Sequence, residues 1–296
     1  MSMVVVALPG AELFAASLQL SLGCEAGGLR LHCFPDGETC PQFLSPLAGR
    51  DVVLVAALEQ PDQKIMALYL SACVARELGA RSVGLVAPYL PYMRQDAVFA
   101  PGQGVTARHF ARLLSGCCDW MVTVDPHLHR IHALSEVYCI PTEVVPAAPE
   151  IARWIAANVA QPVLVGPDQE SEQWVAHVAA LAACPFTVLR KVRSGDREVA
   201  VSLPPAEILA GRTPVLVDDI VSTARTMCAA VAHLQAAGCP APVCVGVHAL
   251  FIGDACAQLV AAGAGRIVSC DTVRHDSNQI GMAGPLAAAV VRMTSR

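Results

Sequence analysis

The sequence predicts an α/β protein of two domains, each with a mostly parallel β-sheet flanked by helices. The length of 296 residues is about twice that of a typical single domain. Short runs rich in Val and Leu alternate with longer stretches of helical period, which is the pattern of a parallel sheet covered by helices. The Pro-rich stretch from Pro141 to Pro149 separates two such series. We therefore expect domains at 1–145 and 146–296.

The predicted strands are short apolar runs, with helices in the gaps between them. The N-terminal segment has no basic residue before Arg30, so it lacks the charged start of a secretory signal and fits a first strand. The halves also echo each other, because DVVLVAALEQ and PVLVDDIVST are each followed by a helical stretch. Duplication or ordinary α/β regularity explains this echo. The further strands expected are Val52–Leu58, Ser82–Ala87, Trp120–Asp125, Pro162–Gly166, Pro214–Asp218 and Pro242–Val247.

The composition favours a cytoplasmic protein with small-molecule ligands. Hydrophobic residues make up 54% and charged residues 15%, which indicates extensive burial or a subunit interface. The net charge of −5 comes without a basic stripe, so neither a nucleic acid nor a membrane surface is an expected partner. No apolar run reaches the roughly 18 residues of a membrane-spanning helix. The thirteen cysteines include no CxxC pair, which favours reduced thiols over disulfides.

The strongest local signal is VLVDDIVSTART at 215–226, where an apolar strand ends in two aspartates and a polar turn opens a helix. Backbone N–H groups at a helix N-terminus bind anions such as phosphate. The carboxylates of Asp218 and Asp219, at the carboxyl end of a parallel strand, suit the vicinal hydroxyls of a sugar. The alternative is a simple N-cap formed by residues 219–223. The hydroxyl side chains of the turn are Ser222, Thr223 and Thr226.

Other polar segments leave more than one interpretation open. Asp125, His127 and His129 alternate as zinc ligands can, but zinc requires a third or fourth N or S ligand and no spaced cysteine pair is available. FPDGE at 34–38 is a tight turn on residue type alone. LRKVRSGDRE at 189–198 concentrates cations in an expected loop between apolar strands, for which a solvated hairpin tip is the alternative.

Taken in order along the chain, these motifs resemble the ribose-phosphate pyrophosphokinase family, also called phosphoribosyl pyrophosphate (PRPP) synthases. The turn at 215–226 resembles the PRPP-binding loop of type I phosphoribosyltransferases. The resemblance implies two phosphoribosyltransferase-like domains and transfer of the β,γ-pyrophosphate of Mg·ATP to O1 of ribose 5-phosphate, giving PRPP and AMP. The matching segments are FPDGE (34–38), PYMRQD (91–96), DPHLH (125–129), GPD (166–168), KVRSGD (191–196) and VHALF (247–251).

The resemblance also implies roles for individual residues. It places Phe34, Asp36 and Glu38 in the ATP site of a neighbouring subunit, so that a homo-oligomer is built from dimers with a shared site. It implies a catalytic role for Lys191, Arg193 and His127. It also implies Mg²⁺ as the metal, at His127 and Asp168. The further ATP contacts it implies are Arg94, Gln95 and Asp96. The ribose 5-phosphate contacts it implies are Asp218, Asp219, Ser222, Thr223, Ala224, Arg225 and Thr226.

Two departures from the family pattern accompany this resemblance. Ala224 and Arg225 stand where the family has mostly glycine, so Arg225 either crowds the phosphate loop or adds a cation to it. Residues 169–171 are bulkier than the small residues typical after GPD. These departures leave a catalytically silent PRPP synthase-associated regulatory protein as one alternative. A type I phosphoribosyltransferase is another, although it would leave FPDGE and KVRSGD without roles.

Overall fold

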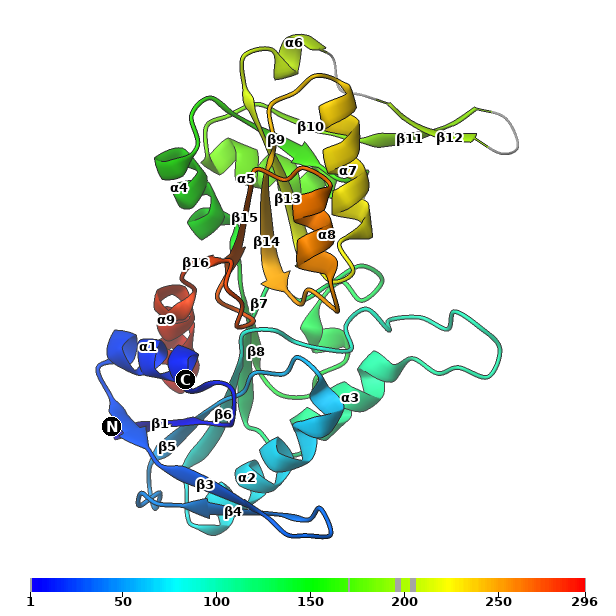
Figure 1. The fold of residues 1–296 in the computed structure, drawn as a ribbon. Helices are drawn as coiled ribbons and strands as arrows, with labels where there is room; N and C mark the ends of the chain where they lie inside the picture. Colours follow the sequence, from blue (N-terminus) through cyan, green and yellow to red (C-terminus); the bar gives the residue numbers. More distant parts are fainter. Residues whose placement is uncertain (1, 170, 195–197, 203–205, 296) are drawn as a thin grey trace. The chain divides into compact units, whose positions relative to one another are not determined.

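The computed structural model describes residues 2–169, 171–194, 198–202 and 206–295. The chain divides into two compact units, one formed by Met1–Val145 with Met282–Arg296 and the other by Pro146–Gly281 (Figure 1). Each unit has its own six-stranded sheet with helices packed against it. This architecture confirms the predicted α/β class with two mostly parallel sheets.

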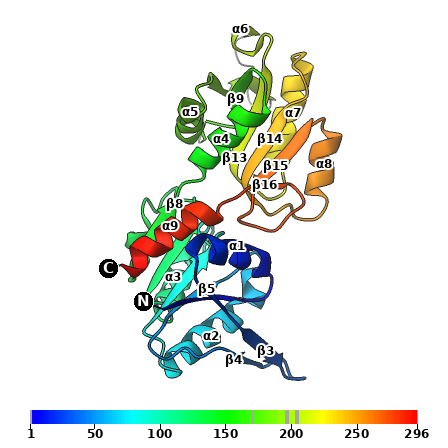
Figure 2. The ribbon, with the colours of Figure 1, turned by 90° about the vertical axis from the view of Figure 1, so that its left-hand side faces the viewer.

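The sheet of the first unit has the strand order β2-β1-β5-β6-β7-β8, with every neighbouring pair parallel. The helices α1 and α9 lie side by side on one face, and Figure 2 shows α2 on the opposite face. The strands are β1 (Met3–Ala7), β2 (Glu25–Gly27), β5 (Asp51–Val55), β6 (Ser82–Ala87), β7 (Trp120–Val124) and β8 (Thr142–Val145). The helices are α1 (Glu12–Leu22), α2 (Ile65–Glu77), α3 (Thr106–Ser115) and α9 (Ala283–Thr294).

An antiparallel hairpin is inserted between β2 and β5. Its strands β3 (Leu29–Cys33) and β4 (Thr39–Phe43) pair from Leu29 opposite Phe43 to Cys33 opposite Thr39. The root of the hairpin lies against the first unit, because α2 packs on β4. The five residues that join the strands are FPDGE, so the predicted tight turn is the tip of this hairpin.

The second unit repeats the strand order of the first, as β10-β9-β13-β14-β15-β16. A separate antiparallel hairpin joins β11 (Arg190–Ser194) to β12 (Glu198–Ser202). The sheet strands are β9 (Pro162–Gly166), β10 (Phe186–Val188), β13 (Thr213–Val221), β14 (Val243–Ala249), β15 (Arg266–Cys270) and β16 (Asn278–Ile280). The helices are α4 (Ala148–Asn158), α5 (Glu172–Leu181), α6 (Ala206–Leu209), α7 (Arg225–Ala236) and α8 (Ala255–Ala261).

The central strands are mostly apolar because both faces of each sheet are covered, although β5 begins with Asp51 and β7 contains Thr123. Every residue of β5 and of β7 is buried. Close packing also explains Gly84 in β6, since a Cβ atom there would collide with the indole of Trp120 on the neighbouring strand. No helix in the described part of the chain is long and apolar enough to cross a membrane.

The last fifteen residues correct the expected domain division. We expected 146–296 to form one domain, but 282–296 belong to the first unit. The reason is that α9 packs on α1 and on the strands β7 and β8, with Leu286 and Val290 fully buried. Arg292 adds a hydrogen-bonded ion pair to Glu143, with Nε donating to Oε1 at 2.8 Å.

We predict that Leu286→Ala destabilises the first unit by about 2–5 kcal/mol, because the truncation leaves a cavity under α9. Hydrogen exchange should accelerate in α1 and β7 and stay unchanged in β14. The matched control is Leu259→Ala in α8, an equally buried leucine of the second unit, which should show the reverse pattern. Faster exchange in β14 of the Leu286→Ala variant would contradict the assignment of α9.

Candidate active site

The loop between β13 and α7 carries the predicted phosphate-binding residues. The strand β13 continues past its apolar core to Val221, three residues beyond the predicted end. Asp218 and Asp219 are therefore half-buried residues within the last part of the strand. Ser222 is half-buried and Thr223 exposed before α7 begins at Arg225. Thr226 is exposed in the first turn of α7. The first N–H groups of any helix lack intrahelical acceptors, so they are available to an anion here.

The segment after β14 holds this loop in place. The backbone N–H of Phe251 donates to the carbonyl of Val221 at 3.0 Å, and the N–H of Ile252 donates to the carbonyl of Ser222 at 3.1 Å. VHALF, one of the motifs that carried the family resemblance, therefore supports the hydroxyl-rich turn from the neighbouring strand.

Three carboxylates of the second unit influence one another at the edge of β9 and β13. Burial, followed by the negative charges of Asp219 and Asp168, raises the pKa of Asp218 well above its ordinary value. Asp168 follows β9, which pairs with β13, and its Oδ1 accepts the N–H of Ser171 at 3.2 Å. Closely placed carboxylates with a raised pKa favour a ligand that brings hydroxyl donors or a cation.

The carboxylates around Asp168 suit a hard cation such as Mg²⁺ only if a bound ligand supplies further oxygen atoms. In the described part of the chain, no group of three or more His, Cys, Asp or Glu side chains is arranged to hold a metal ion. Mg²⁺ is usually held by one or two carboxylates together with water and substrate phosphates. Asp168 and its neighbours offer carboxylate oxygens of this kind, so the residues fit Mg²⁺ that arrives with a phosphorylated ligand.

The alternative in which residues 219–223 merely cap the helix is wrong. The N-cap of α7 is Ala224, without a side-chain capping bond, and Oδ1 of Asp219 accepts the N–H of Ile220 at 2.7 Å. Ala224 is buried with φ of 55° and ψ of 8°, a left-handed conformation that glycine adopts with less strain. Arg225 is exposed at the first position of α7, which favours the interpretation that it adds a cation over crowding.

We predict that Asp218→Asn stabilises the ligand-free protein at pH 7. A carboxyl group whose pKa is raised in the folded state lowers the free energy of unfolding as pH rises above the pKa of the unfolded state, near 3.8. The reason is that ionisation of the group is harder in the folded protein than in the unfolded chain. The gain should shrink as pH is lowered toward that value. Melting temperatures of both proteins between pH 4 and pH 8 measure it. A variant less stable than the parent at pH 7 would show that Asp218 is not under repulsion.

In the first unit, FPDGE presents an exposed aromatic ring at the hairpin tip. The Phe34 N–H donates to the Glu38 carbonyl at 2.8 Å, and Gly37 donates to the Phe34 carbonyl at 2.9 Å with φ of 94°. The Phe34 side chain is 44% exposed and contacts His32 edge to face, with ring centroids 4.5 Å apart. Asp36 and Glu38 are exposed as well. An apolar ring held outward by a tight turn is suited to contact with another molecule.

A second group of polar residues joins two loops of the first unit. The Asp96 carboxylate is 2% exposed and accepts the backbone N–H of Arg130 at 2.9 Å and its guanidinium at 3.1 Å. Burial alone would raise the pKa of Asp96, but the hydrogen bonds from Arg130 outweigh it and lower that pKa. The Arg130 guanidinium also lies over the Phe99 ring, 5.5 Å from its centroid. Asp96 thus ties the segment after β6 to the segment after β7.

The hydrogen bonds to Arg130 distinguish Asp96 from the other two predicted ATP contacts. Arg94 and Gln95 are exposed, whereas Asp96 is buried with both oxygens bonded to Arg130. Gln95 lines a cavity of about 480 Å³. Nothing in the local sequence signals Arg130, because its partner lies 34 positions away. The other lining residues of the cavity are Ala97, Phe99, Gln103, Gly104 and Thr106.

His127 follows β7 in the loop that Arg130 fixes. It is half-buried and His129 is exposed, with their ring centroids 6.3 Å apart. Asp125, the first residue after the strand, has a positive φ of 27°. The chain therefore departs from regular strand geometry as soon as β7 ends.

The predicted catalytic cations lie in a strand and not in the expected loop. Lys191 and Arg193 are alternate residues of β11, opposite Val201 and Val199 of β12. The side chains of 190–206 lie outside the described part of the structure, as do residues 170 and 195–197. The closing residues of KVRSGD and Glu170 of the altered GPD segment are thus not described.

The fold and the loop after β13 define a protein of the phosphoribosyltransferase class. Residues 142–283 match the phosphoribosyl transferase domain. Residues 3–117 match the N-terminal domain of ribose phosphate pyrophosphokinase.

Similarity extends over the whole chain. A ribose-phosphate pyrophosphokinase of Methanopyrus kandleri is 32% identical over 99% of this chain and 100% of the relative, and one of Halobacterium salinarum is 34% identical over 93% and 96%. The crystal structure of a phosphoribosylpyrophosphate synthetase from Mycobacterium smegmatis has the same fold, with a TM-score of 0.87 at 21% identity over 100% of this chain and 99% of that one. The chain belongs to the ribose-phosphate pyrophosphokinase family.

Proposed function

We propose that the protein converts ATP and ribose 5-phosphate to AMP and PRPP. The observation that carries this proposal is the edge of β9 and β13, where three interacting carboxylates adjoin a hydroxyl-rich turn at a helix N-terminus. In a chain of this family, that arrangement suits a phosphorylated sugar with free hydroxyls. None of the thirteen cysteines is in a disulfide, which supports a cytoplasmic location.

The second unit supplies the sugar site. Asp218 and Asp219 accept hydrogen bonds from ribose hydroxyls, which relieves the repulsion between the carboxylates. The 5-phosphate binds the backbone N–H groups that begin α7, where the helix dipole favours an anion. The cation of Arg225 adds to that attraction. Three hydroxyl side chains complete the phosphate contacts, namely those of Ser222, Thr223 and Thr226.

The first unit supplies the nucleotide contacts. Arg94 and Gln95 bind ATP beside the cavity that Gln95 lines. Asp96 is a positioning residue, because its carboxylate is committed to Arg130 and so fixes the loop that carries His127. His127 contacts the phosphates. Phe34 packs on the adenine ring of ATP bound to a partner subunit, and Asp36 and Glu38 contact the polar edge of that ring.

The reaction is a direct in-line displacement. The anomeric hydroxyl of the sugar attacks the β-phosphorus of ATP, a new O1–P bond forms, and AMP departs with the bridging oxygen. Lys191 and Arg193 stabilise the charge that develops on the transferred group, and positioning supplies most of the remaining acceleration. Asp168 and His127 are the residues that would hold Mg²⁺ with the phosphates, and the ion neutralises phosphate charge when bound.

We predict AMP and PRPP as the products when the purified protein is incubated with Mg²⁺, ATP and ribose 5-phosphate. Chromatography of the nucleotides separates AMP from ADP. Asp219→Asn should weaken ribose 5-phosphate binding much more than ATP binding, because its carboxylate is assigned to the sugar. ADP as the product would mean γ-phosphoryl transfer and would reject the reaction, and a lack of any turnover would favour a silent regulatory protein.

We also predict that two inactive variants complement each other, since the exposed Phe34 is assigned to the site of a partner subunit. Phe34→Ala and Lys191→Ala should each abolish activity alone. In a mixed dimer, one site combines both intact residues while the other carries both lesions. Random pairing of equal amounts should therefore restore about a quarter of the parent activity across a two-fold interface. No recovery, with subunit exchange verified by native mass spectrometry, would place Phe34 in the site of its own chain.

A further inference from the structure

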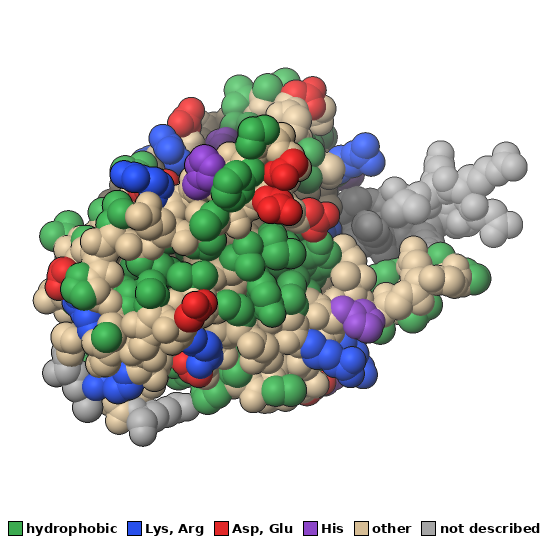
Figure 3. Space-filling view, turned by 90° about the horizontal axis from the view of Figure 1, so that it is seen from below, with side chains coloured by type: hydrophobic (Ala, Val, Ile, Leu, Met, Phe, Trp, Pro, Cys, Tyr) green, Lys and Arg blue, Asp and Glu red, His purple; other side chains and the backbone are tan. Residues whose placement is uncertain are grey.

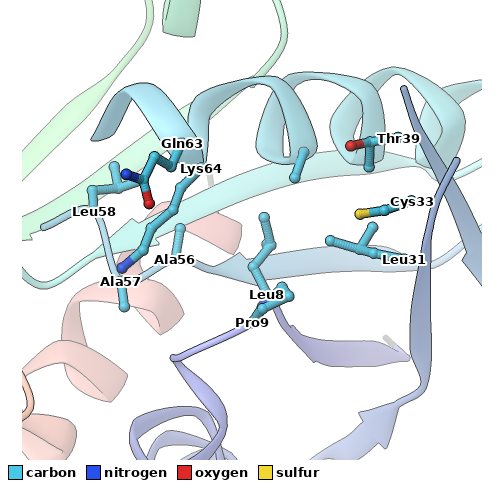
Figure 4. A pocket seen from close by; sticks show the side chains of 11 residues that line it. Leu8, Pro9, Leu31, Cys33, Thr39, Ala56, Ala57, Leu58, Gln63 and Lys64 are labelled. Carbon is cyan, nitrogen blue, oxygen red and sulfur yellow. The ribbon is translucent and has the colours of Figure 1, made fainter. Parts of the chain in front are cut away.

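A second cavity of the first unit has no role in the proposed reaction. It encloses about 280 Å³ at the carboxyl ends of β1 and β5, between the half of the β3–β4 hairpin next to its tip and the first turn of α2 (Figure 4). Most of its walls are apolar, and Lys64 is its charged side chain. The lining residues are Leu8, Pro9, Leu31, Cys33, Thr39, Ala56, Ala57, Leu58, Gln63, Lys64 and Ala67.

The cavity occupies the place in the first unit that the sugar site occupies in the second. Both sheets have the same strand order, with β1 and β5 standing where β9 and β13 stand. The registers align as well, because the first pair of the ladder is Met3 with Asp51 in one unit and Pro162 with Thr213 in the other. Counting forward from these pairs gives the equivalent positions in the loops.

This alignment shows that the three acidic positions have become apolar. Pro9 stands in the place of Asp168, while Ala56 and Ala57 stand in the places of the paired aspartates at 218 and 219. All three of these residues line the cavity. The cavity thus lacks the carboxylates that suit sugar hydroxyls in the second unit, and its mostly apolar walls favour an apolar group instead.

Lys64 adds a positive charge at one end of the cavity. It is one of two lysines in the chain and the N-cap residue of α2, the position that Ala224 holds in α7. Its Nζ lies 2.5 Å from Oε1 of Glu59, and both side chains are more than a quarter exposed. Glu59 does not line the cavity, so an anion within it would share or replace this ion pair.

We propose that this cavity binds a small organic anion, with a ring-sized apolar body between Pro9, Ala56 and Leu31 and a carboxylate or phosphate group beside Lys64. The volume of about 280 Å³ lies just below the usual range for ligand cavities, which begins at about 300 Å³, so the ligand is smaller than a nucleotide. This site is independent of the proposed reaction, because none of its lining residues is assigned to ATP or to ribose 5-phosphate.

Two cysteines on the same hairpin provide the test. Cys33 lines the cavity and is exposed. Cys40 is also exposed, but it follows Thr39, the residue that pairs with Cys33, so strand alternation places Cys40 on the other face of the hairpin. The rate of alkylation by iodoacetamide at each thiol is followed by peptide mass spectrometry, with benzoate, phenyl phosphate or benzyl alcohol present.

Benzoate or phenyl phosphate should slow alkylation of Cys33 severalfold and leave Cys40 unchanged, and the stronger of the two identifies the anionic group. Neutral benzyl alcohol should protect less. Lys64→Met should weaken protection by about fivefold, the worth of one partly exposed charge pair. Glu59→Gln should strengthen it, because the competing carboxylate is gone. Arg153→Met, an exposed residue of the second unit, is the control for charge alone.

Circular dichroism and the melting temperature establish that each variant folds. If Lys64→Met does not fold, the stronger protection expected for Glu59→Gln still tests the role of Lys64. Absence of protection at Cys33 by all three probes would overturn the proposal. So would equal protection of Cys33 and Cys40. Benzyl alcohol protecting as well as the anions, or anion protection that Glu59→Gln leaves unchanged or weakens, would reject the role of Lys64.

Discussion

A parallel sheet covered on both faces admits polar side chains mainly where its strands end. The strands β5 and β7 are buried at every position, because helices cover both sides and an unpartnered polar group there is costly. The carboxyl ends of parallel strands also meet at one edge of the sheet. Polar residues from segments distant in sequence are therefore collected at that edge, and the candidate sites of both units follow from this geometry.

The second unit uses this edge to hold carboxylates close together. Asp218 is desolvated beside Asp219 and Asp168, so its charged form is unfavourable in the ligand-free protein. A sugar that donates hydroxyl hydrogens, or a cation bound with its phosphates, offsets that repulsion. The first unit keeps the same strand order but has Pro9, Ala56 and Ala57 at the equivalent positions. One scaffold thus presents either an acidic or an apolar edge, and the residues after the strands decide its chemistry.

The sequence allowed most of the scaffold to be predicted, including the strand, turn and helix start at 215–226. Ser82–Ala87 and Pro162–Gly166 are strands with the predicted bounds, because their apolar runs end at the sheet edge. The strand predicted at 52–58 ends at Val55 in the structure. The apolar run continues through Ala56 and Ala57 because these residues stay buried or half-buried after the chain leaves the sheet. Periodicity shows that a helix has an apolar face but not which sheet covers it. For that reason the placement of α9 could not be predicted.

The partners of the candidate site residues could not be predicted from local sequence patterns. A motif marks Asp96 as polar, but only the fold shows that Arg130 satisfies its buried carboxylate. That pair stabilises the folded first unit at pH values above the ordinary carboxyl pKa and loses its effect as pH falls through the lowered pKa of Asp96. Asp218 has the opposite sign, because its raised pKa makes the charged form costly. Acid therefore loosens the loop that carries His127 while it relaxes the carboxylates of the sugar site. The interaction of Asp96 with Arg130 is thus attractive and complete within the first unit, whereas the carboxylates around Asp218 in the second unit repel one another.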